Sequence, residues 1–322
     1  MPLTIGVLAE TAEGERRLSV VPDVVKKYQG QGAQVVLQKG AGVPAHFPDG
    51  VFAEVTFADS AADICAQSDV VFCVQPPAAE VIDLMKPGSL LLGMLQPWAS
   101  AERARQLAER QITSFALELL PRISRAQSMD ALSSQGAVAG YECALIAADH
   151  SPKFFPMLTY AAGTIRPAKV LVIGCGVAGL QAIATARRIG AMVEAYDVRP
   201  DTREQVESLG AKFVDTGVSA AGAGGYAREL TDEEKAKQAE RLGKAVAQAD
   251  ALITTAAVPG KRAPRIITAD MIARMKPGAV VVDMAAETGG NVEGTVAGEK
   301  VWINDVLVIG PVNIPSRMPV HA

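Results

Sequence analysis

Short apolar runs of five to nine residues alternate with amphipathic stretches along the whole chain. The runs predict buried strands, and they cover residues 3–9, 34–38, 69–74, 89–95, 112–120, 169–174, 192–197, 251–255, 279–285 and 306–310. Amphipathic helices are predicted in the gaps, for example over residues 100–110 and 232–248. Because strands and helices alternate, the pattern predicts an α/β protein with two doubly wound, Rossmann-like sheets.

A repeated segment supports two related halves. The sequence MKPGSLLLGM (85–94) returns as MKPGAVVVDM (275–284), and each copy combines a helix end, a Pro-Gly turn and an apolar strand. We therefore expect one domain over residues 1–135 and a second over residues 136–322. A long helix over about residues 128–150 is predicted to connect them.

Composition and charge narrow the class of protein. The 322 residues include 29 glycines and only 5% aromatic residues, a mixture that suits parallel sheets covered on both faces. A net charge of −4 without clustered basic residues gives no sign of nucleic-acid binding. The four cysteines lack CxxC or disulfide spacing, which favours a reducing, cytoplasmic setting. Neither a signal peptide nor an apolar window of about eighteen residues is recognisable in the sequence.

The strongest local signal lies in residues 169–197. A predicted strand leads into Gly174-x-Gly176-x-x-Gly179, followed by an amphipathic helix, a second strand and Asp197. In such a motif the first glycine permits a tight turn, the second lets pyrophosphate approach the backbone, and the third lets helix and strand pack closely. The pyrophosphate rests on the helix N-terminus, where the helix dipole favours anions. This arrangement predicts dinucleotide binding.

Asp197 favours NAD(H) over NADP(H). A carboxylate at the end of the second strand can accept hydrogen bonds from two ribose hydroxyls and repels a 2′-phosphate. Arg199, two residues later, could counter that charge, and a strand-end cap is the purely structural interpretation of Asp197. Cys175, inside the glycine loop, is interpreted as a small filler whose backbone faces the phosphates.

The chain offers no obvious base beside a nicotinamide ring. Oxidising an alcohol or amine by hydride transfer requires that an O–H or N–H proton be removed as well, usually by His or Lys. The three histidines, His46, His150 and His321, lie in a loop, at a predicted helix end and near the terminus. No metal-ligand constellation is present either. A hydride transfer that needs no base is therefore favoured.

Residues 121–135, PRISRAQSMDALSSQ, follow the apolar run 112–120 and consist largely of hydrogen-bonding side chains. A solvated loop leading into a helix would explain them. At this point the residues match a family. The chain resembles the NAD(H)-binding component, the first domain of the α subunit, of proton-translocating nicotinamide nucleotide transhydrogenase, and more distantly alanine dehydrogenase. The motifs that carry the resemblance are residues 122–134, 174–186, 196–200, 224–227, 254–264 and 280–291.

The resemblance implies a set of site residues. A loop of the first domain would reach over the nicotinamide, with Gln127 bringing the dihydronicotinamide against NADP(H) on a partner subunit. The residues implied at the nicotinamide and its ribose are Arg122, Gln127, Asp130 and Ser133. Those implied at the rest of the nucleotide are Gly174, Cys175, Gly176, Val177 and Gly179 at the pyrophosphate, Asp197, Val198 and Arg199 at the adenosine ribose, Gly225 and Tyr226 in a mobile flap, and Gln238 and Ala257.

The resemblance also implies partners. These are an NADP(H)-binding β subunit, a membrane-spanning component that couples hydride transfer to proton translocation, and a second copy of the chain in a homodimer. The chain would lie on the inner face of the cytoplasmic membrane through these subunits, with NAD(H) as its own cofactor and no metal.

Two other functions remain open from the residues. Alanine dehydrogenase has an N-terminal arginine, which Arg17 matches, but Gln75 and Gln96 stand where that enzyme has Lys and His. Without those two groups, pyruvate binding and proton transfer have no carrier. A non-catalytic NAD-binding module would keep the glycine loop and Asp197, but it would not require the polar residues of 122–133.

Overall fold

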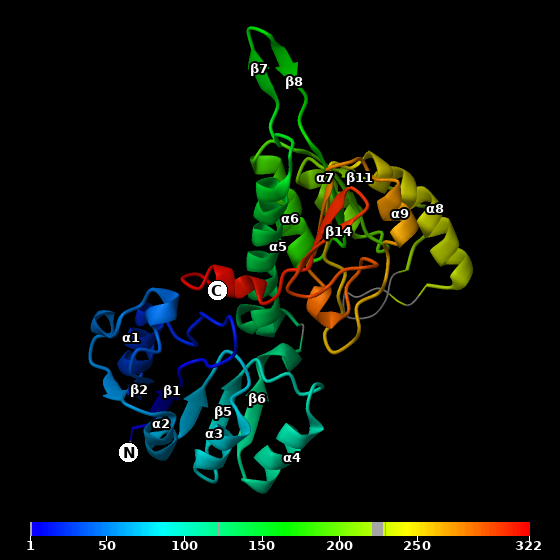
Figure 1. Ribbon diagram of the computed structural model, residues 1–322. Coiled ribbons are helices and arrows are strands. Elements are labelled where there is room, and N and C mark those ends of the chain that lie inside the picture. The colour runs from blue at the N-terminus through cyan, green and yellow to red at the C-terminus, as the bar shows by residue number, and fades with distance from the viewer. Residues whose placement is uncertain (1, 122, 221–227, 229) are drawn as a thin grey trace. The chain divides into compact units, whose positions relative to one another are not determined.

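The protein is described by a computed structural model that covers residues 2–121, 123–220, 228 and 230–322 (Figure 1). The described chain forms two compact units. Unit 1 comprises Met1–Ser134 together with Pro315–Ala322, and unit 2 comprises Gln135–Ile314. Both have the predicted α/β architecture with parallel, Rossmann-like sheets, so the predicted fold class is confirmed.

The sheet of unit 1 is parallel throughout. Its strands are β1 (Thr4–Val7), β2 (Gln34–Gln38), β3 (Thr56–Ala58), β4 (Val70–Phe72), β5 (Leu90–Gly93) and β6 (Thr113–Ala116), in the order β3-β2-β1-β4-β5-β6. The helices between them are α1 (Pro22–Gly30), α2 (Ala61–Gln67), α3 (Ala79–Leu84) and α4 (Ala101–Glu109). The strand order reverses between β1 and β4, and in such sheets ligands bind at the carboxyl ends beside this reversal.

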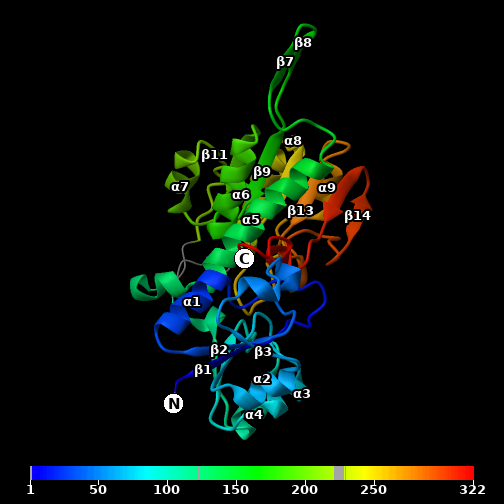
Figure 2. The same ribbon diagram turned by 90° about the vertical axis from the view of Figure 1, so that its left-hand side faces the viewer.

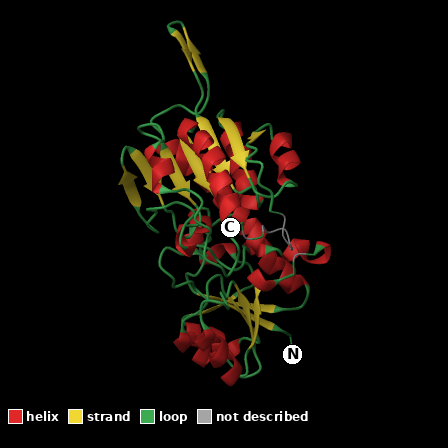
Figure 3. Cartoon of the chain, turned by 90° about the vertical axis from the view of Figure 1, so that its right-hand side faces the viewer, coloured by secondary structure: helices red, strands yellow, loops and turns green. Residues whose placement is uncertain are grey.

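The sheet of unit 2 repeats this plan (Figure 3). Its strands are β9 (Lys169–Ile173), β10 (Met192–Tyr196), β11 (Lys212–Phe213), β12 (Ala251–Thr254), β13 (Val280–Asp283), β14 (Lys300–Ile303) and β15 (Val306–Ile309), in the order β11-β10-β9-β12-β13-β15-β14. Only β14 is antiparallel within this sheet. The helices are α5 (Ala131–His150), α6 (Val177–Arg188), α7 (Thr202–Ser208), α8 (Asp232–Gln248) and α9 (Ala269–Ala273).

Both faces of the unit 2 sheet are buried, which explains the continuous apolar runs. On β9, Val170 and Val172 belong to a core with residues of α5 and α6, whereas Leu171 and Ile173 belong to a second core with residues of α8 and α9. A side chain on either face of this strand must therefore be apolar. All ten predicted strands are present for this reason.

The five strands that the pattern missed are short. They are β3, β7 (Leu158–Tyr160), β8 (Gly163–Ile165), β11 and β14. Strands β7 and β8 pair only with each other, as an antiparallel hairpin that projects from unit 2 (Figures 1 and 2). Because edge strands and hairpins carry exposed or polar side chains, they lack the apolar run that marks a central strand.

The segment after β6 departs from the prediction. The predicted strand 112–120 ends at Ala116 and continues as a 3₁₀ turn, Leu117–Leu119. The reason is Glu118, whose buried carboxylate accepts the backbone N–H groups of Leu95 and Gln96 and therefore turns inward. A second 3₁₀ segment covers Ser124–Met129, and the predicted connecting helix begins at Ala131 rather than at 128.

The repeated segments occupy equivalent places in the two sheets. Strand β5 lies beside β4, and β13 lies beside β12, one strand away from the reversal in each case. Met85 and Met275 are both buried, and Gly88 and Gly278 both take left-handed backbone conformations, with φ of 83° and 78°. The repeat in the sequence is therefore a repeat of one βα element.

Candidate functional site

The glycine loop of unit 2 joins β9 to α6 at the carboxyl edge of the sheet. Gly174 has φ of 89°, a left-handed conformation that favours glycine. A Cβ on Gly179 would lie 1.7 Å from the carbonyl oxygen of Gly174, whereas a Cβ on Gly176 would meet no atom within 4 Å. The first and third glycines thus allow the turn and the close packing of helix on strand. The second borders open space.

That open space adjoins a helix N-terminus. Gly176 is the N-cap residue of the twelve-residue helix α6, and no side chain caps it. Val177, the first helical residue, is exposed. The first N–H groups of a helix lack intrahelical partners and lie at the positive end of its dipole. The loop can therefore accept a phosphate group without any rearrangement of the backbone.

Asp197 lies beside this loop because of the strand register. Ile173 pairs with Tyr196 of β10 and with Thr254 of β12, so the next residues, Gly174, Asp197 and Thr255, share one edge of the sheet. Asp197 is 8% exposed. Its Oδ2 accepts the backbone N–H of Cys175 at 2.7 Å and Arg199 Nη2 at 2.7 Å. Its Oδ1 accepts the backbone N–H and Nε of Arg199, both at 2.9 Å.

The thiol of Cys175 points away from solvent. The residue is 1% exposed, and its Sγ contacts the carbonyl oxygen of Tyr196 at 3.5 Å. Burial raises the pKa of this thiol well above its usual range, and the charge of Asp197 raises it further. A thiolate, the reactive form, is therefore disfavoured here.

Gln238 lies in the interior of unit 2. It is 8% exposed, and its Nε2 donates to the Tyr196 hydroxyl at 2.8 Å. The Thr216 hydroxyl donates to the same oxygen at 3.4 Å. Tyr196 immediately precedes Asp197, so this buried polar group joins α8 to the strand end that carries the acid. Val198 is half-buried in the same turn.

Ala257 lies just beyond β12, in a loop held by a residue that sequence reasoning passed over. The side chain of Asn291 is fully buried, and it bonds both backbone groups of Ala256, at 3.0 and 2.7 Å. Its backbone N–H donates to Asp283 Oδ1 at 3.2 Å, and the Thr254 hydroxyl donates to the same oxygen at 3.0 Å. The motif 280–291 contains Asp283 and Asn291, but only their long-range partners show that they shape this edge.

The polar loop of unit 1 forms the start of α5. The backbone N–H of Ser133 donates to Asp130 Oδ1 at 3.0 Å, and its hydroxyl donates to Asp130 Oδ2 at 2.6 Å. Asp130 therefore caps the helix, which is a structural reason for both residues. Gln127 is exposed on the preceding 3₁₀ segment. Arg122, Gly225 and Tyr226 lie outside the described residues.

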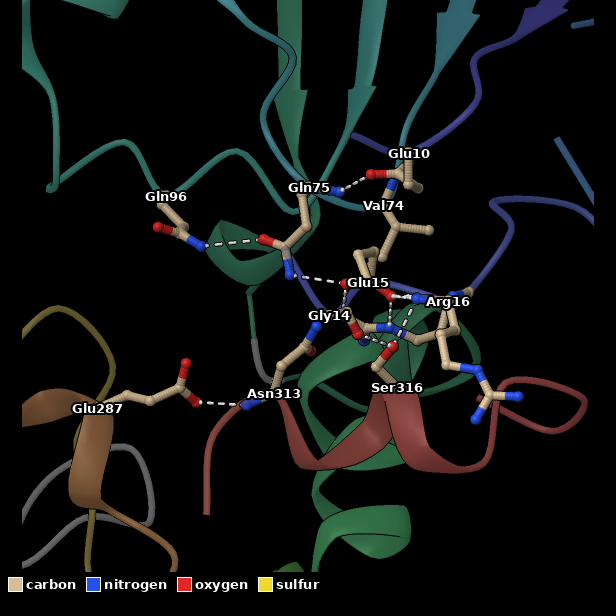
Figure 4. A network of polar contacts seen from close by, with 11 residues as sticks. Glu10, Gly14, Glu15, Arg16, Val74, Gln75, Gln96, Glu287, Asn313 and Ser316 are labelled. Atoms are coloured by element: carbon tan, nitrogen blue, oxygen red, sulfur yellow. Dashed lines mark hydrogen bonds and ion pairs between the residues drawn. The ribbon is translucent and has the colours of Figure 1, made fainter. Parts of the chain in front are cut away.

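The strand reversal of unit 1 is occupied by its own polar side chains (Figure 4). Arg17 donates to both oxygens of Glu15, at 2.8 and 2.7 Å, and both residues are buried. Gln75 Nε2 donates to Glu15 at 3.0 Å, and Gln96 Nε2 donates to Gln75 at 3.2 Å. Burial alone would raise the pKa of Glu15, but the hydrogen bonds and charge of Arg17 outweigh it and hold the pKa at about 2.

The edge of the same network holds the C-terminal segment in unit 1. The Ser316 hydroxyl accepts the backbone N–H of Arg16 at 2.6 Å and donates to the carbonyl of Gly14 at 2.8 Å (Figure 4). Ser316 is 2% exposed. These two bonds fix the residues around Glu15 and Arg17, three hundred positions away in sequence.

Two features are absent from the described part of the chain. None of its helices combines the length and apolar character needed to cross a bilayer. None of its His, Cys, Asp and Glu side chains gather in groups of three or more that could hold a metal ion.

Comparison with known proteins decides the family. The family described as alanine dehydrogenase/PNT matches through its N-terminal domain over residues 6–139 and through its C-terminal domain over residues 143–322. The chain belongs to the alanine dehydrogenase/PNT family.

Within this family the nearer relatives are transhydrogenase subunits. An NAD(P) transhydrogenase alpha subunit of Rhodospirillum rubrum, the first portion of a divided subunit, is 45% identical over 99% of this chain and 86% of its own length. The crystal structure of transhydrogenase from Sinorhizobium meliloti has a TM-score of 0.89 at 39% identity, covering 99% of this chain and 89% of that one. Alanine dehydrogenase of Mycobacterium tuberculosis is 28% identical over 98% of this chain and 82% of its own length. Alanine dehydrogenase is thus the more distant relative, and the predicted resemblance is confirmed.

Proposed function

We propose that the chain is the NAD(H)-binding alpha component of an NAD(P) transhydrogenase. It holds NADH at the carboxyl edge of the unit 2 sheet and passes the hydride directly to NADP⁺ on a β subunit. A membrane-spanning component couples this transfer to proton translocation, and the chain associates with the inner face of the cytoplasmic membrane through these partners. The observation that carries the proposal is the open approach at Gly176 beside Asp197, in a chain whose relatives are transhydrogenase alpha subunits.

The chemistry at the strand reversal of unit 1 supports hydride transfer without a base. The side chains of Gln75 and Gln96 are amides, which neither carry charge nor exchange a proton near neutral pH. Arg17 already holds the carboxylate of Glu15. An amino-acid dehydrogenase needs a group that takes a proton from its substrate, whereas direct transfer between two nicotinamides does not.

The residues of the proposed NAD(H) site divide by role. Gly174 and Gly179 shape the loop, and Cys175, Gly176 and Val177 bind the pyrophosphate through the backbone. Asp197, Val198 and Arg199 lie at the adenosine ribose, and Gly225 and Tyr226 close over the nucleotide. Ala257 adds a contact at the end of β12, and Gln238 acts through Tyr196. Arg122, Gln127, Asp130 and Ser133 position the nicotinamide.

Reconstitution tests this function. The chain is mixed with an NADP(H)-binding β subunit, and hydride exchange between NADH and an NADP⁺ analogue is followed by absorbance. We expect exchange only when both proteins are present. The chain alone, given NAD⁺ and alanine, should form no NADH, and steady turnover with alanine would instead establish an amino-acid dehydrogenase.

We also propose that the chain forms a homodimer through the β7–β8 hairpin of unit 2. A two-stranded hairpin is marginally stable by itself in water, yet this one projects with Met157, Tyr160 and Ile165 exposed at 62%, 56% and 38%. At its foot lies an apolar cavity of about 460 Å³, lined by Leu145, Ala148, Pro152, Phe154, Phe155, Pro156 and Ile189 among others. One chain thus carries both an unpartnered apolar arm and an apolar hollow. A two-fold pairing of identical chains satisfies both at once.

The alternation of side chains along the hairpin provides a matched test. Leu158 pairs with Ile165, and Tyr160 lies on the same face, whereas Thr159 and Thr164 face the opposite way. We expect the double substitution Tyr160→Ser and Ile165→Ser to weaken dimerisation roughly a hundredfold or more, because each copy loses two apolar side chains worth about 1.5–3 kcal/mol apiece when buried. Sedimentation velocity over a dilution series measures this. Thr164→Ser should leave the dimer intact, and equal effects of both variants would argue against the hairpin.

A further inference from the structure

Arg199 occupies the carboxylate that a ribose needs. Both oxygens of Asp197 are engaged by the side chain of Arg199, Oδ1 by Nε at 2.9 Å and Oδ2 by Nη2 at 2.7 Å. The backbone N–H groups of Arg199 and Cys175 take one further position on each oxygen. A carboxylate offers about four lone-pair positions. All four are thus used by groups of the chain itself.

A ribose hydroxyl can therefore bind Asp197 only if the guanidinium yields at least one of these positions. The two backbone donors are fixed by the loop and by the turn after β10, so the side chain of Arg199 is the donor that can move. Its side chain is 22% exposed, compared with 6% for that of Asp197. After moving, it remains tethered two residues from the acid and stays charged, because arginine does not lose its proton in proteins.

The position of this cation matters for the nucleotide's 2′ group. A ribose held by Asp197 places its 2′ substituent within a few ångströms of the carboxylate and hence near the displaced guanidinium. A 2′-phosphate there is repelled by Asp197, and arginine is the side chain best suited to bind phosphate. The two charges thus act in opposite directions on NADPH, whereas NADH carries no 2′ charge.

We propose that Arg199 is a specificity-determining residue that limits the preference for NADH over NADPH set by Asp197. In the nucleotide-free chain it neutralises the acid, and in the nucleotide complex it offsets the repulsion of a 2′-phosphate. This inference rests on the proposed function, since it assumes that unit 2 binds NAD(H) at this edge.

Substitution of Arg199 by an uncharged residue of similar length tests the inference. Kd values of NADH and NADPH are measured by fluorescence titration of the full chain and of Arg199→Met. We expect the ratio of the NADPH Kd to the NADH Kd to rise about tenfold or more, because a charge pair a few ångströms apart near a protein surface changes binding by that order. The increase should come mainly from weaker NADPH binding, and the salt dependence of NADPH binding should fall.

Arg203 provides a matched control. It lies four residues later, on α7, pairs with Asp215 at 2.6 Å and covers the ring of Phe213 at 4.6 Å. Arg203→Met removes the same charge from the same unit, and it should change the ratio by no more than about twofold. A comparable rise in both variants would reduce the effect to general electrostatics and overturn the inference.

A further variant separates a specificity role from a structural one. If Arg199 only holds Asp197 in place, Arg199→Met should weaken both nucleotides equally and leave the ratio unchanged, which would overturn the inference. In Asp197→Asn the repulsion is gone, and adding Arg199→Met should still weaken NADPH selectively if the guanidinium acts on the phosphate. Loss of that selective effect also counts against the inference. A wild-type chain that bound neither nucleotide would overturn the proposed function together with this inference.

Discussion

Replacing Gly179 by alanine should destabilise unit 2 by about 3 kcal/mol or more and remove NADH binding. The new Cβ would lie 1.7 Å from the carbonyl oxygen of Gly174 and 3.1 Å from the Thr255 hydroxyl. That carbonyl cannot easily retreat, because it accepts the Thr255 hydroxyl at 2.8 Å. Overpacking against fixed backbone typically costs about 1–3 kcal/mol and more when nothing can shift. Thermal unfolding and NADH titration measure the two effects.

Gly176→Ala separates binding from stability in the same loop. A Cβ at this position meets no atom within 4 Å, and the backbone of Gly176 has an ordinary negative φ. The variant should therefore unfold at the wild-type temperature. It should nevertheless bind NADH much more weakly, because the methyl group enters the space that the pyrophosphate requires. Wild-type affinity in Gly176→Ala would show that the pyrophosphate binds elsewhere.

Gln127→Ala should lose about a hundredfold in hydride transfer while it still binds NADH. The proposed role of Gln127 is at the nicotinamide, whereas the adenosine and pyrophosphate ends are held by unit 2. Hydride transfer needs the two rings roughly 3–3.5 Å apart, and a displacement of about 1 Å can cost around a hundredfold. Stopped-flow transfer between pre-bound NADH and an NADP⁺ analogue, in the complex with the β subunit, measures the rate directly.

A second exposed glutamine of unit 1 serves as the control for this experiment. Gln67 ends α2 and bonds only locally, to the carbonyl of Asp63 at 3.0 Å. Gln67→Ala should transfer hydride at the wild-type rate. If Gln127→Ala does so as well, residues 121–135 are a solvated loop that leads into α5, and the proposed role of Gln127 is wrong.

The central strands could be predicted because their signal is local. Every residue of β9, β12 and β13 must be compatible with burial on both faces, and this requirement appears directly as an apolar run. The short strands β11 and β14 lie at sheet edges, where one or both faces are solvated, so their composition does not differ from that of a loop. Helix α8 was predictable because a capping box of Thr231 and Glu234 precedes an amphipathic repeat.

The candidate site could be predicted in part for the same reason. Glycine spacing and the acid after the second strand are short-range features, and the structure brings Gly174 and Asp197 to one edge through the register of β9 and β10. Roles that depend on distant partners were not predictable. Asn291 joins the loop after β12 to β13, and Glu118 bends the chain after β6, each through hydrogen bonds to residues more than twenty positions away.

The sequence by itself determined the alternation of elements, the dinucleotide loop and the family, because each depends on residue types at fixed short spacings. Only the tertiary structure decided the partners of the polar side chains. Asp197 is paired with Arg199, Gln238 bonds to Tyr196, and Arg17 is held by Glu15 within a network that reaches Gln75 and Gln96. Hydrogen bonds form between groups that folding brings within about 3 Å. Which groups those are depends on strand order and register, which local sequence does not contain.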